Sequence, residues 1–426
     1  MILKKVFLNI FLFFITFITI SLIAFPILFD LVFSALIIYF FRRKISSIVI
    51  LNSLIIVMVF IIDLSFGKNE KHGYFYRAHE KYATKKKKYE KNVSDTIFMR
   101  YGDIYFIDGG LNKERERIVE PRKQHFVTDS YGLRNDRFNL EEAEIILVGD
   151  SFISAQGTSQ EHTPANILND ISGKKVATLS WAGVSPKDYE ELIKKHLNFL
   201  KKQTDIFVFY FEGNDFEKVN IKENNNLIDN SKYIYWRGYK IPKWKAKIRF
   251  VHERLERNKD KFLLKVFSEK NYFLRNIRRK THLLNRKILT SWTNTGSPIK
   301  YFKIGEEIVG FNYELSEKTK DIFSTYIPQD QEIISRISAV FFIPTKVRVY
   351  SEYINADMKQ TSQKFQILKK RFNLLDVPVY DLSVEMKNSV PSYLSEGKYL
   401  FWRDDTHWNN YGIFVAMNYI DKIINK

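Results

Sequence analysis

Residues 145–152 read Ile145-Ile146-Leu147-Val148-Gly149-Asp150-Ser151-Phe152, an apolar run that stops at a glycine and is followed by a serine. Four consecutive apolar residues are typical of a strand that is buried on both faces of a parallel sheet. Ligand chemistry in open α/β sheets gathers where such strands end. The segment therefore makes Ser151 a candidate nucleophile. On these residues alone, a tight turn in which Ser151 caps a helix is an equally good interpretation.

Similar segments recur along the chain and predict the fold class. Strands are expected near residues 145–148, 175–179, 206–211, 338–343 and 377–381. Helical patterns lie between them, for example from Pro186 to Lys201 and from Ser351 to Phe372. This alternation predicts an α/β domain with a parallel sheet and right-handed crossovers. Residues 216–330 interrupt the rhythm and are interpreted as an insertion, and residues 67–124 as a lead-in segment.

Two further strand ends carry residues that suit the stabilisation of an oxyanion. The expected strand at 175–179 leads to Gly183, and the strand at 206–211 leads to Gly213-Asn214-Asp215. Acyl transfer needs N–H donors that are aimed at the developing negative charge. A glycine backbone and an asparagine amide both supply such donors. Taken singly, a loop glycine and an Asx turn explain Gly183 and Asn214 better.

The segment Asp404-Asp405-Thr406-His407-Trp408 supplies a candidate base. A serine nucleophile needs a base that takes its proton, and the base needs a carboxylate that fixes its tautomer. His407 follows Asp405 by two residues and Asp404 by three, so either carboxylate can reach the ring after a turn. The alternative interpretation of His407 is a surface histidine near the end of the chain.

Together, the blocks at Gly149–Phe152, Gly183, Gly213–Asp215 and His407 resemble those of the SGNH (GDSL-like) hydrolase superfamily over roughly residues 125–426. The similarity is greatest to the branch with bacterial polysaccharide O-acetylation proteins, such as those of alginate. Three further segments favour that branch: Thr128–Asn135, Pro344-Thr345-Lys346 and Asp405–Trp408. The resemblance implies a flavodoxin-like, three-layer parallel sheet. It also implies Ser151 and His407 as catalytic residues, with Ser151, Gly183 and Asn214 as the oxyanion hole. The His-Trp context of that branch favours Asp405 as the carboxylate, with Asp404 as the alternative.

Residues 1–66 predict a membrane anchor. The stretch from Val6 to Phe41 is almost wholly apolar and is interrupted at Pro26 and Asp30, and at about 1.5 Å per residue it exceeds the roughly 30 Å of a bilayer core. We interpret it as two helices that turn near Pro26, and Ile45–Ile62 as a third span. The stretch is too long for a signal peptide, and no small-residue cleavage site is evident.

The basic flanks of these spans predict the orientation of the chain. Lys4-Lys5 and Arg42-Arg43-Lys44 belong on the cytoplasmic side. Three spans then place everything after Asp63 on the periplasmic or extracellular side of the inner membrane. If only two spans exist, the catalytic domain is instead cytoplasmic.

Composition limits the other classes of function. The 426 residues include no cysteine, which excludes thiol catalysis and cysteine-ligated zinc, and the scattered histidines give no support for a metal site. The net charge is +19, and the range Lys232–Lys287 alone holds 19 Lys and Arg against 4 Asp and Glu. Aromatic residues are interleaved there. This pattern suits an anionic membrane or an acidic glycan, or a solvated face over packed aromatics. Nucleic acid is the least favoured partner beside a membrane anchor.

The sequence thus predicts a membrane-anchored, extracytoplasmic esterase or O-acyltransferase that acts on ester-linked acyl groups of a cell-surface polysaccharide. The expected partners are the glycan or acyl ester, the inner membrane and, as a further candidate, a membrane-bound transferase that supplies acyl groups. No cofactor and no nucleic acid are expected. The alternative is a non-catalytic glycan-binding or assembly component of an envelope polysaccharide complex.

Overall fold

The computed structural model describes residues 81–82, 84, 89–108, 112–218, 233–236, 239–242, 298–315, 323–356 and 361–425. The chain divides into two units, of which one comprises Met1–Gly73 and Asp229–Gly296 and the other Tyr74–Ile228 and Ser297–Lys426. The predicted membrane anchor and most of the basic range Lys232–Lys287 lie outside the described residues. Over the part of the chain that is described, no helix is both long and apolar enough to pass through a bilayer.

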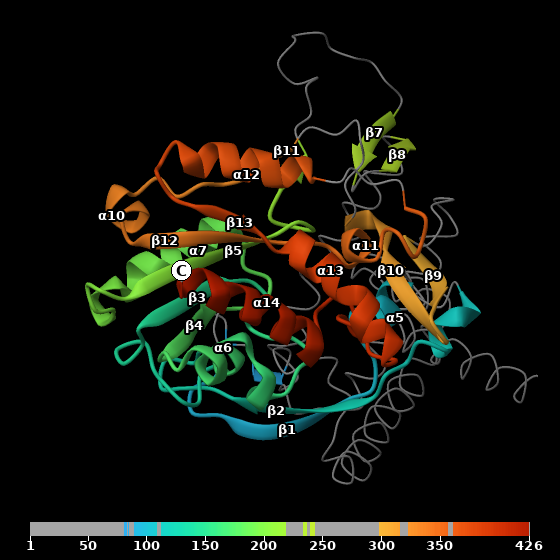
Figure 1. The fold of residues 1–426 in the computed structure, drawn as a ribbon, viewed down its shortest axis with the longest axis horizontal. Helices are drawn as coiled ribbons and strands as arrows, with labels where there is room; N and C mark the ends of the chain where they lie inside the picture. Colours follow the sequence, from blue (N-terminus) through green and yellow to red (C-terminus); the bar gives the residue numbers. More distant parts are fainter. Residues whose placement is uncertain are drawn as a thin grey trace, which may run out of the picture. The chain divides into compact units, whose positions relative to one another are not determined.

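A five-stranded parallel sheet forms the centre of the second unit (Figure 1). Its strands are β3 (Ile145–Gly149), β4 (Val176–Ser180), β5 (Asp205–Phe211), β12 (Ile337–Ile343) and β13 (Val379–Asp381). They lie in the order β13-β12-β5-β3-β4. Numbered along the chain from one edge, this order is 2-1-3-4-5. The structure confirms the predicted α/β class with a parallel sheet.

Helices cover both faces of this sheet, which gives three layers (Figure 1). The helices α6 (Pro164–Ser172), α13 (Leu382–Ser395) and α14 (Asn410–Ile424) share one apolar core with alternate residues of the strands. The rings of Tyr210 and Phe342, on the opposite face, pack against α12 (Gln363–Asn373). Tyr210 also contacts Tyr189 of α7 (Pro186–His196). Because both faces are covered, the central strands β3, β5 and β12 consist mainly of apolar residues.

The segment before the sheet belongs to the same unit. It contains β1 (Ser94–Met99), α5 (Asp103–Asp108) and β2 (Arg122–Val127), and β1 pairs with β2 in an antiparallel ladder. A hairpin of β9 (Ile299–Ile304) and β10 (Glu307–Asn312) packs against α5 through a small cluster of isoleucines. Both segments therefore contribute to the domain that holds the sheet.

Short elements complete the described residues. In the second unit these are η2 (Lys113–Glu116), η3 (Gln160–His162), η4 (Leu197–Phe199), β6 (Glu217–Lys218), η6 (Tyr313–Leu315), β11 (Phe323–Ser324), α10 (Gln331–Ile334) and α11 (Lys346–Val349). In the first unit, β7 (Tyr233–Trp236) pairs with β8 (Tyr239–Pro242) in an antiparallel ladder.

Two predicted helices have different bounds in the structure. The helix expected from Ser351 is wrong over its first part, because α12 begins only at Gln363. The Ser362 side chain caps it by accepting hydrogen bonds from the N–H groups of Lys364 and Phe365, which fixes the start of the helix. The helix expected up to Lys201 ends at His196 and passes into the short 3-10 turn η4.

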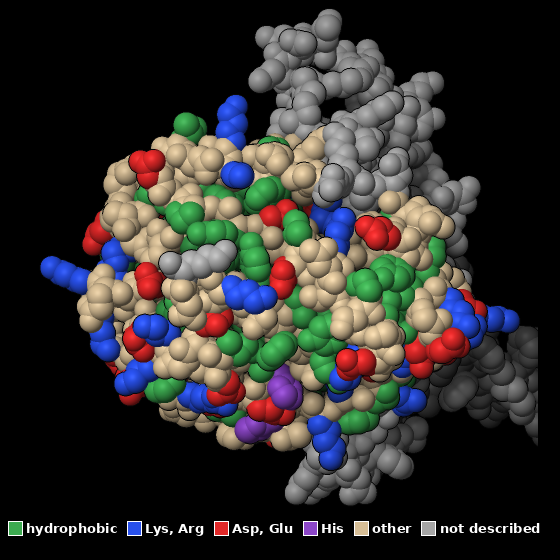
Figure 2. Space-filling model, viewed as in Figure 1, with side chains coloured by type: hydrophobic (Ala, Val, Ile, Leu, Met, Phe, Trp, Pro, Cys, Tyr) green, Lys and Arg blue, Asp and Glu red, His purple; other side chains and the backbone are tan. Residues whose placement is uncertain are grey.

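The surface view shows acidic and basic side chains interspersed on the face that it presents (Figure 2). Ion pairs among the described residues include that of Lys422 with Glu385 at 3.3 Å. On the described part of this face, the charges thus form no patch of a single sign.

Candidate active site

Three neighbouring strand ends bring the predicted oxyanion residues and the candidate nucleophile to one edge of the sheet. Ser151 follows β3, Gly183 follows β4 and Asn214 follows β5, and β3 lies between the other two strands. Gly183 and Asn214 are exposed, and Ser151 is partly exposed. Gly183 has φ +79° and a side chain placed there would meet no atom within 4 Å. A left-handed backbone beside open space suits a glycine whose N–H faces a ligand.

Ser151, His407 and Asp405 form a continuous chain of hydrogen bonds. The Ser151 Oγ lies 2.7 Å from His407 Nε2, and His407 Nδ1 lies 2.7 Å from Asp405 Oδ1. With Asp405 accepting from Nδ1–H, the Nε2 lone pair faces the serine hydroxyl, which is the tautomer that a general base needs. The His407 ring stacks on Phe152 with 4.7 Å between the ring centroids. This contact and the carboxylate fix the plane of the imidazole.

The two adjacent aspartates have different partners. Asp404 is fully buried and accepts hydrogen bonds from Gly102 N at 2.8 Å and from Glu120 N at 3.2 Å. It also pairs with Arg122 Nη1 at 2.9 Å. Arg122 Nη2 lies 3.3 Å from Asp405 Oδ2. The structure therefore brings Asp405 to the imidazole and Asp404 to the backbone of the lead-in segment, which decides between the alternatives that the spacing left open.

A buried lysine holds the loop that carries His407. Lys346 begins α11, and its Nζ donates to the carbonyl oxygens of Trp402 at 2.7 Å, Arg403 at 3.2 Å and Asp405 at 3.2 Å. An ammonium group has three N–H donors, so these three carbonyls match it in number. Burial lowers the pKa of Lys346 to about 7. The residue thus acts on the site through the backbone of the loop.

A buried arginine holds the loop after the nucleophile in a similar way. Arg134 donates to the carbonyl oxygens of Ser154 at 2.8 Å and Thr158 at 2.6 Å, and to Gln160 Oε1 at 3.1 Å. It also donates to Ala155 O, and Ala155 has a left-handed backbone with φ 52°. Burial lowers the pKa of Arg134 to about 10. Since these acceptors lie within ten residues of Ser151, Arg134 fixes the shape of the turn that presents the nucleophile.

Two buried carboxyl groups lie behind the strand ends. Asp150 accepts a hydrogen bond from Phe152 N at 3.0 Å. Asp215 accepts from Tyr189 Oη and Phe211 N, both at 2.8 Å. Burial raises the pKa of both aspartates, and the nearby Asp150 charge raises that of Asp215 further, to well above its ordinary value. Asp215 is therefore the member of the pair that holds a proton more readily.

The sequence analysis missed four residues that hold this site. Arg134 and Lys346 lie inside the segments Thr128–Asn135 and Pro344–Lys346, which the resemblance singled out without assigning them a role. Asp103 and Arg122 lie in the lead-in segment, where no local pattern marks them. Their contacts join residues about 300 positions apart, and such contacts leave no periodicity in a single sequence.

The cluster of Asp103, Asp405 and His407 has the residue types of a metal site. One potential ligand atom of each lies within 4.8 Å of the others. However, Asp405 Oδ1 is taken by the His407 Nδ1–H, and Asp103 accepts hydrogen bonds from the N–H and the hydroxyl of Thr406. A cation would have to displace these protons. The donor set thus fits a hydrogen-bonded cluster better than a metal.

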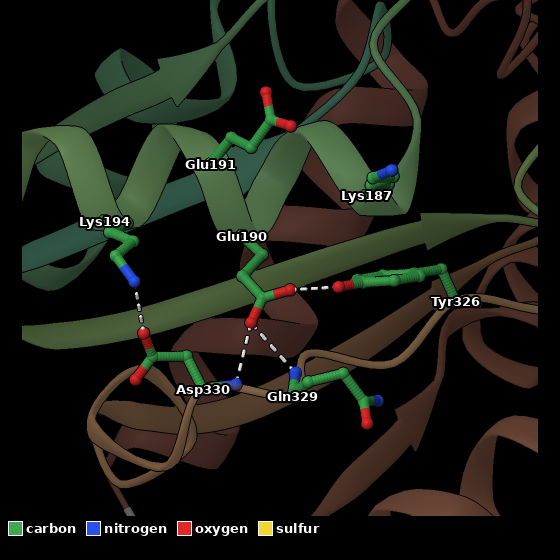
Figure 3. Close-up of a pocket in the computed structure, with 7 residues that line it drawn as sticks. All are labelled: Lys187, Glu190, Glu191, Lys194, Tyr326, Gln329 and Asp330. Carbon is green, nitrogen blue, oxygen red and sulfur yellow. Dashed lines mark hydrogen bonds and ion pairs between the residues drawn. The ribbon is translucent and has the colours of Figure 1, made fainter.

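A pocket of about 400 Å³ lies elsewhere, on α7 (Figure 3). Its lining residues are Lys187, Glu190, Glu191, Lys194, Tyr326, Gln329 and Asp330. Glu190 accepts from the N–H groups of Gln329 and Asp330, and Lys194 pairs with Asp330 at 2.8 Å. These internal partners link α7 to the segment before α10, which indicates a structural role for the charges in this pocket.

Comparison of the chain with protein-family models and with curated proteins gives no match. The function is therefore argued from the geometry of the site and from the residues that compose it.

Proposed function

We propose that the chain is a serine acyl hydrolase or O-acyltransferase of the SGNH type. The observation that carries this proposal is the pair of 2.7 Å contacts that links Ser151 to His407 and His407 to Asp405. The sheet order 2-1-3-4-5, which is also that of flavodoxin, supports it further. So does the placement of Gly183 and Asn214 just after the strands β4 and β5, which flank β3.

The chemistry follows from these positions. His407 Nε2 takes the hydroxyl proton of Ser151 as Oγ attacks the acyl carbonyl, and Asp405 stabilises the imidazolium that forms. The oxyanion lies against the N–H groups of Ser151 and Gly183 and the amide of Asn214. Asn214 is exposed, and its amide NH₂ has two donors that can face the substrate. His407 then gives its proton to the leaving alcohol, and an acyl-Ser151 ester remains.

The second half of the reaction decides between the two activities. His407 deprotonates an acceptor that attacks the acyl-Ser151 ester. A sugar hydroxyl gives transfer, and water gives hydrolysis. The triad is the same for both, and we propose a cell-surface polysaccharide as donor or acceptor because of the resemblance to the O-acetylation branch. Hydrolysis of a small acetyl ester, measured with and without an added glycan, separates the two activities.

A fluorophosphonate probe tests the proposed chemistry. We expect the full chain, purified in detergent, to be labelled, and labelling to vanish in Ser151→Ala. Ser154→Ala is a matched control, because Ser154 Oγ donates to Ser151 O at 3.4 Å and is not the serine that faces His407. Absence of labelling in folded wild-type protein would favour the non-catalytic glycan-binding or assembly component.

We further propose that the domain is anchored in the inner membrane and exported. The support is the apolar composition of residues 6–62 and the basic flanks at Lys4-Lys5 and Arg42-Arg43-Lys44. A periplasmic-type reporter fused after Asp63 should be active, and one fused after Lys44 should be silent. The reverse pattern would place the enzyme in the cytoplasm.

A further inference from the structure

The Nδ1 side of His407 faces a second carboxylate, which comes from the lead-in segment. Asp103 is the first residue of α5, and its Oδ2 lies 3.6 Å from His407 Nδ1. Asp405 Oδ1 lies 2.7 Å from the same nitrogen. Two carboxylates therefore lie beside the one ring nitrogen that stays protonated throughout the proposed reaction.

Asp103 contacts each residue of the turn Asp405-Thr406-His407. Its Oδ1 accepts from Thr406 N at 2.7 Å, and its Oδ2 accepts from the Thr406 hydroxyl. Its own backbone N–H donates to Asp405 Oδ2 at 3.2 Å. Hydrogen bonds to both oxygens give the carboxylate a fixed orientation. Asp103 thus ties the turn to the start of α5, and its charge stays near the imidazole.

The charge matters because His407 becomes positive during the reaction. His407 is 7% exposed, and a positive charge in such a site is unfavourable without a nearby negative charge. Asp405 supplies one charge, but Arg122 lies 3.3 Å from Asp405 Oδ2 and offsets part of it. Asp103 makes hydrogen bonds to Thr406. The buried Lys346 interacts electrostatically with both Asp103 and Asp405, and Asp150 is a further carboxyl group that acts on His407. The negative charge of Asp103, 3.6 Å from Nδ1, adds to the attraction for a proton on the ring.

We propose that Asp103 is a positioning residue of the active site, which orients the Asp405–His407 turn through Thr406 and stabilises the protonated imidazole. This inference rests on the proposed serine chemistry. It extends the site to the segment that precedes β2, so that the sheet and the lead-in segment are both needed for an active enzyme.

The decisive experiment is a titration of the His407 ring in wild type and in Asp103→Asn. The full chain in detergent is followed by NMR of its eight histidines, and His407→Gln identifies the signal. We expect the ring in Asp103→Asn to lose its proton at a pH lower by roughly one unit, because a negative charge has been removed from its neighbourhood. An unchanged titration midpoint in folded Asp103→Asn would overturn the proposal.

Asp108→Asn is the matched control. Asp108 lies on the same helix, and its carboxylate accepts from Asn112 N at 3.1 Å. The same change of charge there should leave the titration of His407 as in wild type. If Asp103→Asn does not fold, Asp103→Ser keeps a small acceptor for Thr406 N and removes the charge, and the same shift is expected. An equal shift of the His407 titration midpoint in Asp108→Asn would show that any loss of a negative charge on this helix has the same effect. That result would overturn the specific role of Asp103.

A kinetic measurement separates the orienting role from a role in folding. We expect Asp103→Asn to lower kcat on a small acetyl ester by roughly tenfold with KM unchanged, and to move the acid limb of the pH profile to lower pH. A purely structural role for Asp103 would lower the melting temperature and leave the acid limb of the pH profile in place.

The NMR titration needs no enzymatic activity. An unlabelled wild-type protein would therefore refute the proposed function, while the titration would still decide the place of Asp103.

Discussion

The geometry predicts opposite consequences for two adjacent aspartates. In Asp405→Asn the side chain can present its NH₂ to Nδ1, which forces the proton to Nε2, or present its oxygen without the charge that stabilises the imidazolium. Asp405 Oδ1 lies 2.7 Å from His407 Nδ1, so either loss acts directly on the base. We expect turnover to fall by roughly 10³–10⁴, equivalent to roughly 4–5.5 kcal/mol of transition-state stabilisation.

Asp404→Asn should instead affect stability. The Asp404 carboxylate holds Gly102 N, Glu120 N and Arg122 Nη1 in a fully buried position. Breaking a buried ion pair costs about 3–5 kcal/mol, and the lower end applies here because Arg122 keeps Asp405 and backbone carbonyls as partners. Turnover of the folded variant should stay within about tenfold of wild type, since Asp404 acts on the turn and not on the ring.

The assay compares both variants on one substrate. Hydrolysis of p-nitrophenyl acetate by the full chain in detergent gives kcat and KM, with Ser151→Ala as the background rate. Thermal unfolding followed by circular dichroism gives the stability, and rates are compared at a temperature where all variants are folded. A severe loss of turnover confined to Asp404→Asn would refute the assignment of Asp405 and the branch of the superfamily on which it was predicted.

Three further changes probe the parts of the site around the triad. Asn214→Ala should lower turnover of the small acetyl ester by about 10²–10³ with little effect on thermal unfolding, because it removes one oxyanion donor and the side chain is exposed. Lys346→Met should lower kcat by roughly tenfold with KM unchanged, because three carbonyls of the His407 loop lose their common donor; a wild-type kcat would contradict that role. Asp215→Asn should flatten the pH dependence of stability. The pKa of Asp215 is raised in the folded state. The protonated carboxyl therefore stabilises the wild-type fold at pH below its ordinary pKa of about 4, and this stabilisation is lost as the pH rises through the raised pKa of the folded state. Urea unfolding of both proteins at acid and neutral pH should therefore show that the free energy of unfolding of Asp215→Asn, relative to wild type, increases with pH. The same pH dependence of the unfolding free energy in both proteins would contradict this.

The elements that the sequence predicted correctly are those that can be recognised from their own residues. The strands β3, β5 and β12 each contain a continuous apolar run because both faces of the sheet are covered, and the residues that follow these strands are mostly polar or glycine. The predicted start of α12 was wrong because the helical pattern in the sequence extends upstream of the residue that caps the helix. Only the hydrogen bonds that Lys364 N and Phe365 N donate to Ser362 Oγ show which serine begins the helix.

The choice between Asp404 and Asp405 shows where local reasoning stops. Both are carboxylates within three residues of His407, and spacing alone permits either. The structure separates them through groups that are remote in sequence. N–H groups of Gly102, Glu120 and Arg122 donate to the Asp404 carboxylate. Asp405 is therefore the carboxylate that is left to accept a hydrogen bond from the His407 ring. The catalytic assignment of one residue thus depends on the lead-in segment, in which the sequence shows no motif.

Two buried basic side chains support the site without taking part in the proposed reaction. The loops that carry Ser151 and His407 both expose several carbonyl oxygens toward the interior, where a neutral donor could satisfy only one or two. Arg134 and Lys346 each supply several N–H groups from one side chain, and each is almost fully buried. Burying a basic side chain is unfavourable without such acceptors, so each loop and its Arg134 or Lys346 side chain stabilise one another. The contact between Ser151 Oγ and His407 Nε2 is therefore set by the backbone of two loops, each of which a buried basic side chain holds in one conformation.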